Sequence, residues 1–107
     1  MKNQSGSRIY ISGPITGIEN NNRDAFAEAE KHITSKGYEA VNPLTLGEEY
    51  KKSVSFEPSW YDYMKVCIKA LMDCDAICVL DDHYNSRGAM IEIELAVKLK
   101  IPEYFIT

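Results

Sequence analysis

The sequence lacks several features that would place it in a functional class at once. Among its 107 residues, no apolar run approaches the roughly 18 residues that a membrane-spanning helix needs. Residues 1–7 are polar and hold no hydrophobic segment of the kind found in a secretory signal peptide. Basic residues form no block and number 12 against 16 acidic ones, so we expect no nucleic-acid surface. These absences predict a cytoplasmic protein without a membrane or a nucleic-acid polymer as partner.

Cysteine and histidine are too few and too scattered for a disulfide framework or a metal site. Cys67, Cys74 and Cys78 are an odd number and lie in apolar surroundings, as is typical of buried, reduced thiols. Neither His32 nor His83 has a partner at the spacing of zinc ligands. We therefore expect no metal ion, no redox group and no other cofactor.

The composition that is present is that of a globular protein. Hydrophobic residues make up 45% and charged residues 26% of the chain, which argues against disorder, collagen-like structure and a coiled coil. The length fits a single domain spanning 1–107. Within it, we expect residues 1–7 to be a flexible tail.

Strand-like and helix-like patterns alternate along the chain. Apolar runs predict strands at about 8–12, 38–41, 76–80 and 104–106. Helical spacing with caps and breakers predicts helices at about 20–35, 44–50, 60–73 and 86–100. In the first of these helices, Phe26, Ala29 and Ile33 recur at i, i+3 and i+7 and share one apolar face, and residues 20–22 offer N-caps. This order predicts an α/β fold with a small parallel sheet of four to five strands and helices on both faces. Ligands of such sheets bind beyond the carboxyl ends of the strands, so we expect the functional residues there.

One acidic residue of the last predicted helix, Glu92, has an unusual setting. Its neighbours three and four positions away are small or apolar and include no cation. Glu94 differs, because Lys98 follows at i+4 and makes an ordinary ion pair. Glu92 also lies in the first two turns, where the helix dipole favours the ionised form. Two interpretations stay open: a carboxylate that meets a ligand, or a glutamate that is partly exposed or bonded to a nearby loop.

Other polar positions also have two interpretations each. The turn at 12–17 contains Gly13 and Gly17 and either cradles an anion with its N–H groups or is a plain tight turn. It matches neither the dinucleotide nor the P-loop pattern. Tyr10 is a core aromatic or a phenol directed at the site. Asp62 completes a capping box three residues after a serine, and Ser86 caps the last helix or contacts a ligand.

Two motifs together resemble the nucleoside 2-deoxyribosyltransferase-like superfamily. The first is YISGPITG at 10–17, and the second is SRGAMIE at 86–92, followed by Ala96. The segment 60–78, with Cys-Asp-Ala at 74–76, resembles a small bacterial and phage branch of that superfamily. The resemblance covers about 8–106, and it is the combination of the two end motifs that makes it specific.

This resemblance implies a three-layer flavodoxin-like (Rossmann-like) sandwich that cleaves N-glycosidic bonds of nucleosides or nucleotides. It implies that Glu92 is the nucleophile and that Tyr10 orients its carboxylate. It also implies a homodimer whose ligand is a nucleoside or nucleotide. The implied substrate-binding residues are Ser12, Gly13, Pro14, Ile15, Thr16, Gly17, Asp62, Cys67, Ser86, Arg87 and Gly88.

Two positions depart from the pattern of that superfamily. Cys67 stands where its enzymes carry the acid that handles the leaving base, and a thiol is a poor general acid. Asp62 lies about 140° around the helix from it and does not replace it easily. Thr16 stands where nucleotide hydrolases carry a basic residue for the phosphate, which leaves Arg87 as the nearby cation of the motifs. Three functions therefore stay open: a deoxyribosyltransferase or N-glycosidase, a non-catalytic nucleotide-binding module, and an interaction domain.

Overall fold

The computed structural model describes residues 7–106, so the tail expected at 1–7 lies almost wholly outside the described residues. Strands and helices alternate along the chain as the sequence predicts, with two short 3-10 turns (η1 and η2) between them. The elements are β1 (Arg8–Ser12), η1 (Glu19–Asn22), α1 (Arg23–Ser35), β2 (Glu39–Val41), α2 (Pro43–Ser53), α3 (Trp60–Met72), β3 (Ala76–Val79), η2 (His83–Asn85) and α4 (Arg87–Lys98).

The strands form an open parallel sheet in the order β2-β1-β3. The central position of β1 is visible in its register, where Tyr10 pairs with Val41 on one side and with Ile77 on the other. Four of the five residues of β1 are buried, as expected of a strand that is covered on both faces. The prediction of an α/β fold with a small parallel sheet is confirmed.

The predicted number of strands is wrong, because residues 7–106 form three and not four or five. The segment expected to be the last strand makes a single parallel bridge, between Ile77 and Glu103. Here the N–H of Ile77 donates to the carbonyl of Pro102 at 3.0 Å, and the N–H of Tyr104 donates to the carbonyl of Ile77 at 2.8 Å. A longer ladder does not form beside β3, because Pro102 has no N–H to donate and Lys100 turns the chain just before it with a φ of 58°.

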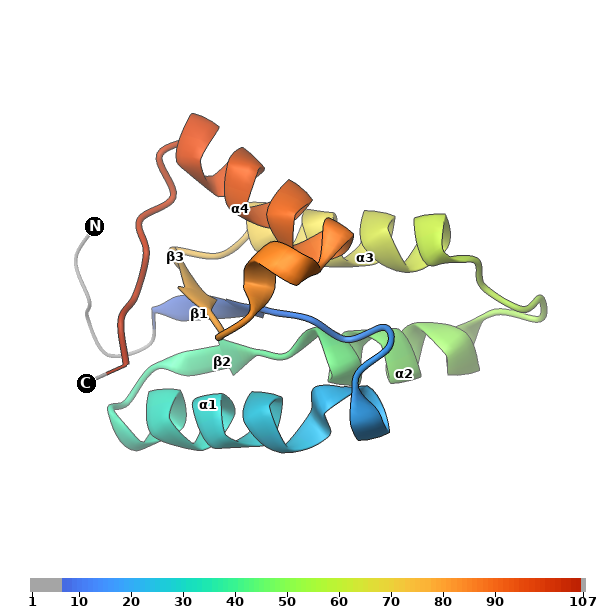
Figure 1. Ribbon diagram of the computed structural model, residues 1–107, viewed down its shortest axis with the longest axis horizontal. Helices are drawn as coiled ribbons and strands as arrows, with labels where there is room; N and C mark the ends of the chain where they lie inside the picture. Colours follow the sequence, from blue (N-terminus) through green and yellow to red (C-terminus); the bar gives the residue numbers. More distant parts are fainter. Residues whose placement is uncertain (1–6, 107) are drawn as a thin grey trace.

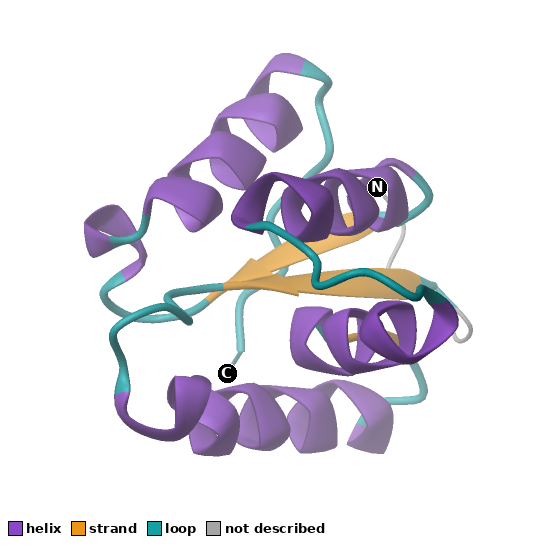
Figure 2. Ribbon diagram, turned by 90° about the vertical axis from the view of Figure 1, so that its right-hand side faces the viewer, coloured by secondary structure: helices purple, strands orange, loops and turns teal. Residues whose placement is uncertain are grey.

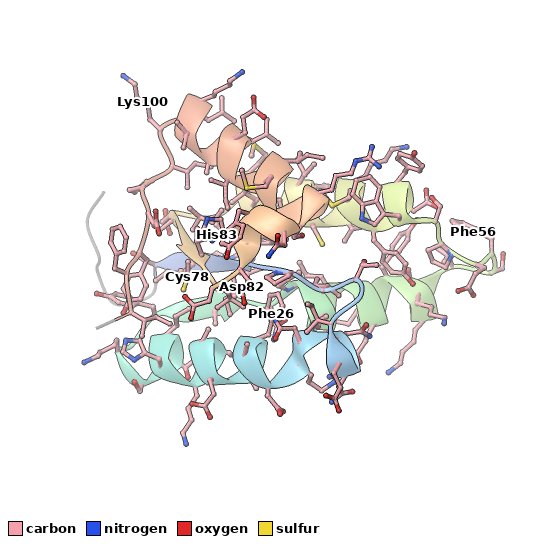
Figure 3. The ribbon with its side chains drawn as sticks, viewed as in Figure 1. Phe26, Phe56, Cys78, Asp82, His83 and Lys100 are labelled. Atoms are coloured by element: carbon pink, nitrogen blue, oxygen red, sulfur yellow. The ribbon has the colours of Figure 1, made fainter. Side chains whose placement is uncertain are left out.

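On one face of the sheet, α1 packs against β1. Ile9 and Ile11 of β1 join Phe26, Ala29 and Ile33 of α1 in a buried apolar cluster. These three helix residues recur at i, i+3 and i+7, so the predicted buried face of this helix is confirmed. Figure 1 shows α1 below the strands, and Figure 3 shows the Phe26 side chain between this helix and the sheet.

On the opposite face, Tyr10 of β1 packs with α3 and α4. Its buried partners include Cys67 and Leu71 of α3 and Ala96 of α4. Figures 1 and 2 both show the strands lying between helices on their two sides. Tyr10 and Ile9 are adjacent in sequence yet belong to different clusters, because successive side chains of a strand point to opposite faces.

The helices begin at the carboxyl end of the sheet, and α2, α3 and α4 each begin with a side-chain cap, which Ser59 provides for α3. Asn42 accepts the N–H of Leu44 at 2.9 Å at the start of α2. Ser86 accepts the N–H of Ala89 at 3.1 Å at the start of α4. The capping expected of Asn22 is not seen: its amide instead donates to the carbonyl of Pro14 at 3.0 Å and ties the first loop to α1. In the described part of the chain, no helix combines the length and the apolar character that a bilayer crossing requires.

Candidate active site

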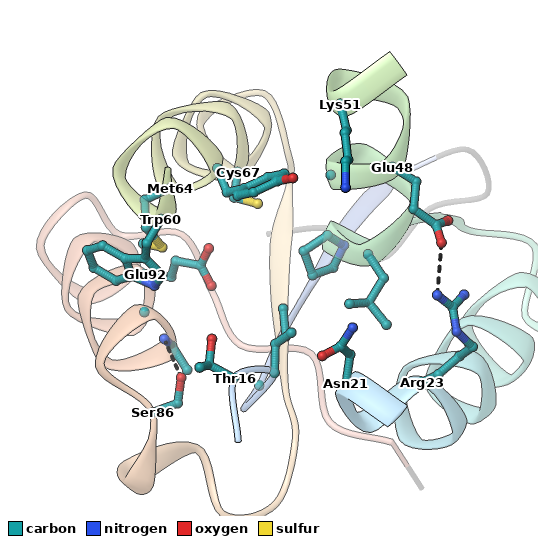
Figure 4. A pocket seen from close by; sticks show the side chains of 18 residues that line it. Thr16, Asn21, Arg23, Glu48, Lys51, Trp60, Met64, Cys67, Ser86 and Glu92 are labelled. Carbon is teal, nitrogen blue, oxygen red and sulfur yellow. Dashed lines mark hydrogen bonds and ion pairs between the residues drawn. The ribbon is translucent and has the colours of Figure 1, made fainter. Parts of the chain in front are cut away.

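A cavity of about 360 Å³ lies at the carboxyl end of the sheet (Figure 4). All four helices and the loop after β1 contribute to its wall, which is the location expected for a ligand in a parallel sheet. The faces of α2 and α3 form two sides. The first two turns of α4, the β1 loop and the start of α1 form the other sides. The lining residues are Gly13, Ile15, Thr16, Asn21, Arg23, Pro43, Leu44, Gly47, Glu48, Lys51, Trp60, Tyr63, Met64, Cys67, Ser86, Gly88, Ala89 and Glu92.

The carboxylate of Glu92 is buried in this wall and held by two hydroxyl groups. The residue is only 5% exposed. Tyr10 donates its phenol O–H to Oε2 at 2.6 Å, and Ser12 donates its hydroxyl to Oε1 at 2.7 Å. Figure 4 shows the carboxylate turned toward the cavity. The side chain of Glu92 is therefore neither exposed nor bonded to a loop, because both of its partners belong to β1.

No cation neutralises this carboxylate within residues 7–106. The ion pairs of the described residues all involve other glutamates. Two short bonds from neutral donors fix the orientation of the Glu92 carboxylate, and each oxygen retains acceptor capacity. Such a group keeps its negative charge available for a ligand.

Burial changes the acid–base properties of Glu92 and of two neighbouring groups, the Tyr10 phenol and the Cys67 thiol. Loss of solvent raises the pKa of the Glu92 carboxyl above its usual value, and the bonds from Tyr10 and Ser12 oppose that rise. Burial also raises the pKa of the Tyr10 phenol, to which the charge of Glu92 adds. For the Cys67 thiol, burial raises the pKa to about 11. Tyr10 and Cys67 are thus protonated at neutral pH and serve as neutral neighbours of the carboxylate.

Two glycines allow the elements of the wall to approach one another. A Cβ atom on Gly13 would lie 2.8 Å from Cβ of Leu80, so only glycine fits between β1 and the end of β3. A Cβ atom on Gly88 would lie 3.1 Å from the sulfur of Met64, which is tighter than ordinary contact. Both glycines belong to the two motifs identified in the sequence, and both bring Glu92 and the β1 loop to the same cavity.

The β1 loop is divided between two cavities. Gly13, Ile15 and Thr16 line the cavity that contains Glu92. Pro14 instead lines a separate cavity of about 440 Å³ beside α1. Gly17 has a φ of +84°, and no atom lies within 4 Å of where its Cβ would be, so it serves the turn. Of the residues at 13–17 that were predicted to bind substrate, the structure thus brings Gly13, Ile15 and Thr16 to the cavity of Glu92 and leaves Pro14 and Gly17 outside its lining.

Asp62 and Arg87 also lie outside the cavity lining. Asp62 completes the capping box of α3: its carboxylate accepts the N–H of Ser59 at 2.8 Å, while the Ser59 hydroxyl accepts the N–H of Asp62 at 3.2 Å. The bonds that the N–H and the hydroxyl of Ser59 donate to this carboxylate lower the pKa of Asp62. The Arg87 guanidinium stacks on the Trp60 ring, 4.4 Å from its centroid. Ser86, by contrast, both caps α4 and lines the cavity.

Comparison with known proteins identifies the family of this chain. The chain belongs to a family described as a domain of unknown function (DUF4406). The match spans residues 7–104, which include the whole cavity wall. No curated protein matches the chain.

Several residues that line the cavity were not predicted from the sequence. Arg23 and Lys51 bring positive charge to it, and Trp60 and Tyr63 bring aromatic surface. Lys51 was missed because α2 continues to Ser53, beyond the predicted end at 50. A signal for α3 was available, because Trp60, Met64, Cys67 and Leu71 recur at helical spacing on one face. The first three line the cavity, and the last two are buried.

The described residues contain no group of three or more histidine, cysteine or acidic side chains arranged to hold a metal ion. Cys67, Cys74 and Cys78 are all buried and unpaired. For each thiol, burial raises the pKa to about 11, so none is an activated thiolate at neutral pH.

Proposed function

We propose that the cavity binds a nucleoside or nucleotide and that Glu92 cleaves its N-glycosidic bond as a nucleophile. The observation that carries the proposal is a buried carboxylate held by two neutral hydroxyl donors in the wall of a ligand-sized cavity. The resemblance of 10–17 and 86–92 to nucleoside 2-deoxyribosyltransferase-like enzymes supports the same chemistry. Tyr10 and Ser12 of the first motif each donate a hydrogen bond to Glu92 of the second.

The first step is a substitution at the anomeric carbon. An oxygen of the Glu92 carboxylate forms a bond to C1′, the bond from C1′ to the base breaks, and its electron pair leaves with the base. Positive charge develops on the sugar in the transition state. An anionic carboxylate without a cationic partner stabilises that charge in a site partly screened from water.

The second step releases the sugar from Glu92. A water molecule, or a second base, attacks C1′ and the ester bond breaks, which returns the electron pair to the Glu92 carboxylate. The attacking water or base loses one proton to solvent. Tyr10 and Ser12 stay protonated throughout and hold the carboxylate in one orientation, so that little reorganisation accompanies each step.

Departure of the base is the step that these residues assist least. The Cys67 thiol faces the cavity with a pKa of about 11, and Asp62 is engaged in the cap of α3. The base therefore takes its proton from water, which favours bases that leave easily. Replacing Cys67 by aspartate is expected to increase the rate of base release by roughly a hundredfold, the low end of what a positioned acid contributes.

A second function, nucleotide binding without cleavage, is favoured by that same thiol. A cavity with a buried carboxylate and no acid for the leaving base fits a module that recognises a nucleotide and does not turn it over. In that case the protein binds a nucleotide but releases no base over long incubation, and Cys67→Asp creates activity rather than increasing it.

The proposal also includes the finer features of the fold. We regard β2-β1-β3, with helices on both faces and the Ile77–Glu103 bridge at the edge, as a reduced form of a flavodoxin-like three-layer sandwich. The order 2-1-3 is the one with which such doubly wound sheets begin. If the fold is related in this way, the cavity lies where ligands of flavodoxin-like proteins usually bind.

The decisive experiment measures release of free base from the four 2′-deoxynucleosides and their 5′-monophosphates by chromatography. Glu92→Gln is expected to abolish release, because the amide is a poor nucleophile and carries no charge. Glu94→Gln is the matched control on the same helix, since Glu94 is exposed and paired with Lys98. Equal rates in the two variants would rule out the nucleophile.

A further inference from the structure

The side of the cavity away from Glu92 carries two basic residues that the motifs do not include. Arg23 is the first residue of α1, and Lys51 lies in the last turn of α2; both line the cavity. Figure 4 shows Lys51 directed into the cavity from α2, across from Glu92, with Arg23 on the far side.

Neither cation is held by a buried partner. Arg23 pairs with Glu48 at 2.8 Å, and the two side chains are 48% and 54% exposed. Lys51 approaches Glu57 at 3.6 Å, and these side chains are 58% and 79% exposed. Exposed pairs of this kind contribute little and exchange partners readily, so both cations are available to a stronger anion.

The helices add positive potential to the same space. Residues at the start of all four helices line the cavity: Arg23 of α1, Pro43 of α2, Trp60 of α3, and Ser86, Gly88 and Ala89 at the start of α4. The N–H groups in the first turn of a helix carry partial positive charge and favour anions. Glu92 occupies one side of this field, and its charge repels a second anion placed close to it. A ligand anion is therefore favoured on the side of Lys51 and Arg23.

We propose that Lys51 and Arg23 form a phosphate subsite and that the ligand is a nucleoside 5′-monophosphate. This inference rests on the proposed function and adds the substrate class to it. The phosphate replaces Glu57 and Glu48 as partner of the two cations, while the sugar lies between them and Glu92. A cavity of about 360 Å³ lies within the size range that small ligands occupy.

The test compares binding of the four 2′-deoxynucleosides and their 5′-monophosphates by titration calorimetry at low salt. It uses both the unaltered protein and Glu92→Gln, which does not turn the ligand over. We expect a monophosphate to bind about tenfold more tightly than its nucleoside, the size of one charge-assisted hydrogen bond. Lys51→Gln should remove most of that difference. Lys52→Gln, the neighbouring lysine outside the cavity lining, is the control and should not.

A second variant acts in the opposite direction. Glu48 lines the cavity as an anion beside Arg23, so Glu48→Gln should tighten monophosphate binding more than nucleoside binding. Equal affinities for nucleoside and monophosphate, equal losses in Lys51→Gln and Lys52→Gln, or no binding at all overturn the subsite. Base release from nucleosides alone also overturns the subsite while the proposed function survives. A Lys51-dependent preference without base release supports the subsite and overturns only the cleavage.

Discussion

The two faces of β1 are equally buried but differ in what they bury. Ile9 and Ile11 are fully buried in an apolar cluster with α1. Tyr10 and Ser12 are buried to the same extent on the other face, and their hydroxyls point to the carboxylate of Glu92. Alternation along one strand therefore places stabilising packing on one face and a charge that burial destabilises on the other.

This contrast teaches that burial by itself does not identify the purpose of a residue. On the α1 face, removing apolar surface from water stabilises the fold. On the α4 face, burying Glu92 raises its pKa and opposes folding in the ionised state. A residue that is kept buried at the expense of stability is typical of a functional site.

The largest expected effect lies on the α1 face. Phe26 is fully buried, and we expect Phe26→Ala to lower the free energy of unfolding by about 4 kcal/mol, through lost contacts and the cavity left behind. Urea denaturation measures this change. Phe56 is the matched control, because it is 53% exposed in the loop between α2 and α3 and stands at the far end of the molecule in Figure 3. A similar loss in Phe56→Ala would contradict the assignment of the core.

The next largest effect concerns the junction between the sheet and the β1 loop. We expect Gly13→Ala to destabilise the protein by about 2 kcal/mol, because the new methyl group would overlap Leu80. Gly47→Ala in α2 should have the opposite sign and stabilise by about 1 kcal/mol, since its Cβ would lie at an ordinary 3.5 Å from Tyr63. Thermal unfolding of the two variants gives the comparison, and equal signs would refute it.

We expect Glu92→Gln to stabilise the protein. This result would sharpen the contrast between the two faces of β1. The folded-state pKa of Glu92 is raised above its ordinary value of 4.5, so the folded state binds the proton more tightly than the unfolded state. Wild-type stability therefore falls as the pH rises from about that ordinary value through the raised one. The variant lacks this loss and above that window should be more stable by on the order of 1 kcal/mol. Unfolding curves between pH 4 and pH 8 test the sign.

The smallest expected effect is that of Asp62, which lies in the first turn of α3 but outside the cavity lining. Asp62→Asn weakens the capping box with Ser59 and should lower the melting temperature slightly. Because the bonds that it makes lower its pKa, its contribution to stability is present at neutral pH and disappears as the pH falls through the lowered value. Nucleotide affinity should not change; a clear loss would restore Asp62 to the site.

Local patterns were sufficient for much of the fold. Residues 8–12 and 76–80 are short apolar runs, and Phe26, Ala29 and Ile33 share a helical period, so strands and a buried helix face were predicted correctly. The last strand was not, because three residues of suitable composition do not decide whether a neighbouring strand offers a partner. The end of α2 was also misplaced, since 51–53 are polar and carry no periodic signal.

The composition and order of residues determined that this chain alternates strands with helices and that Glu92 has no cation on its own helix. Tertiary structure alone decided what surrounds Glu92. Tyr10 and Ser12 lie 82 and 80 residues away in the sequence, and Lys51 and Arg23 come from two further helices. Such distant groups meet because parallel strands bring their carboxyl ends to one edge, which no local pattern specifies.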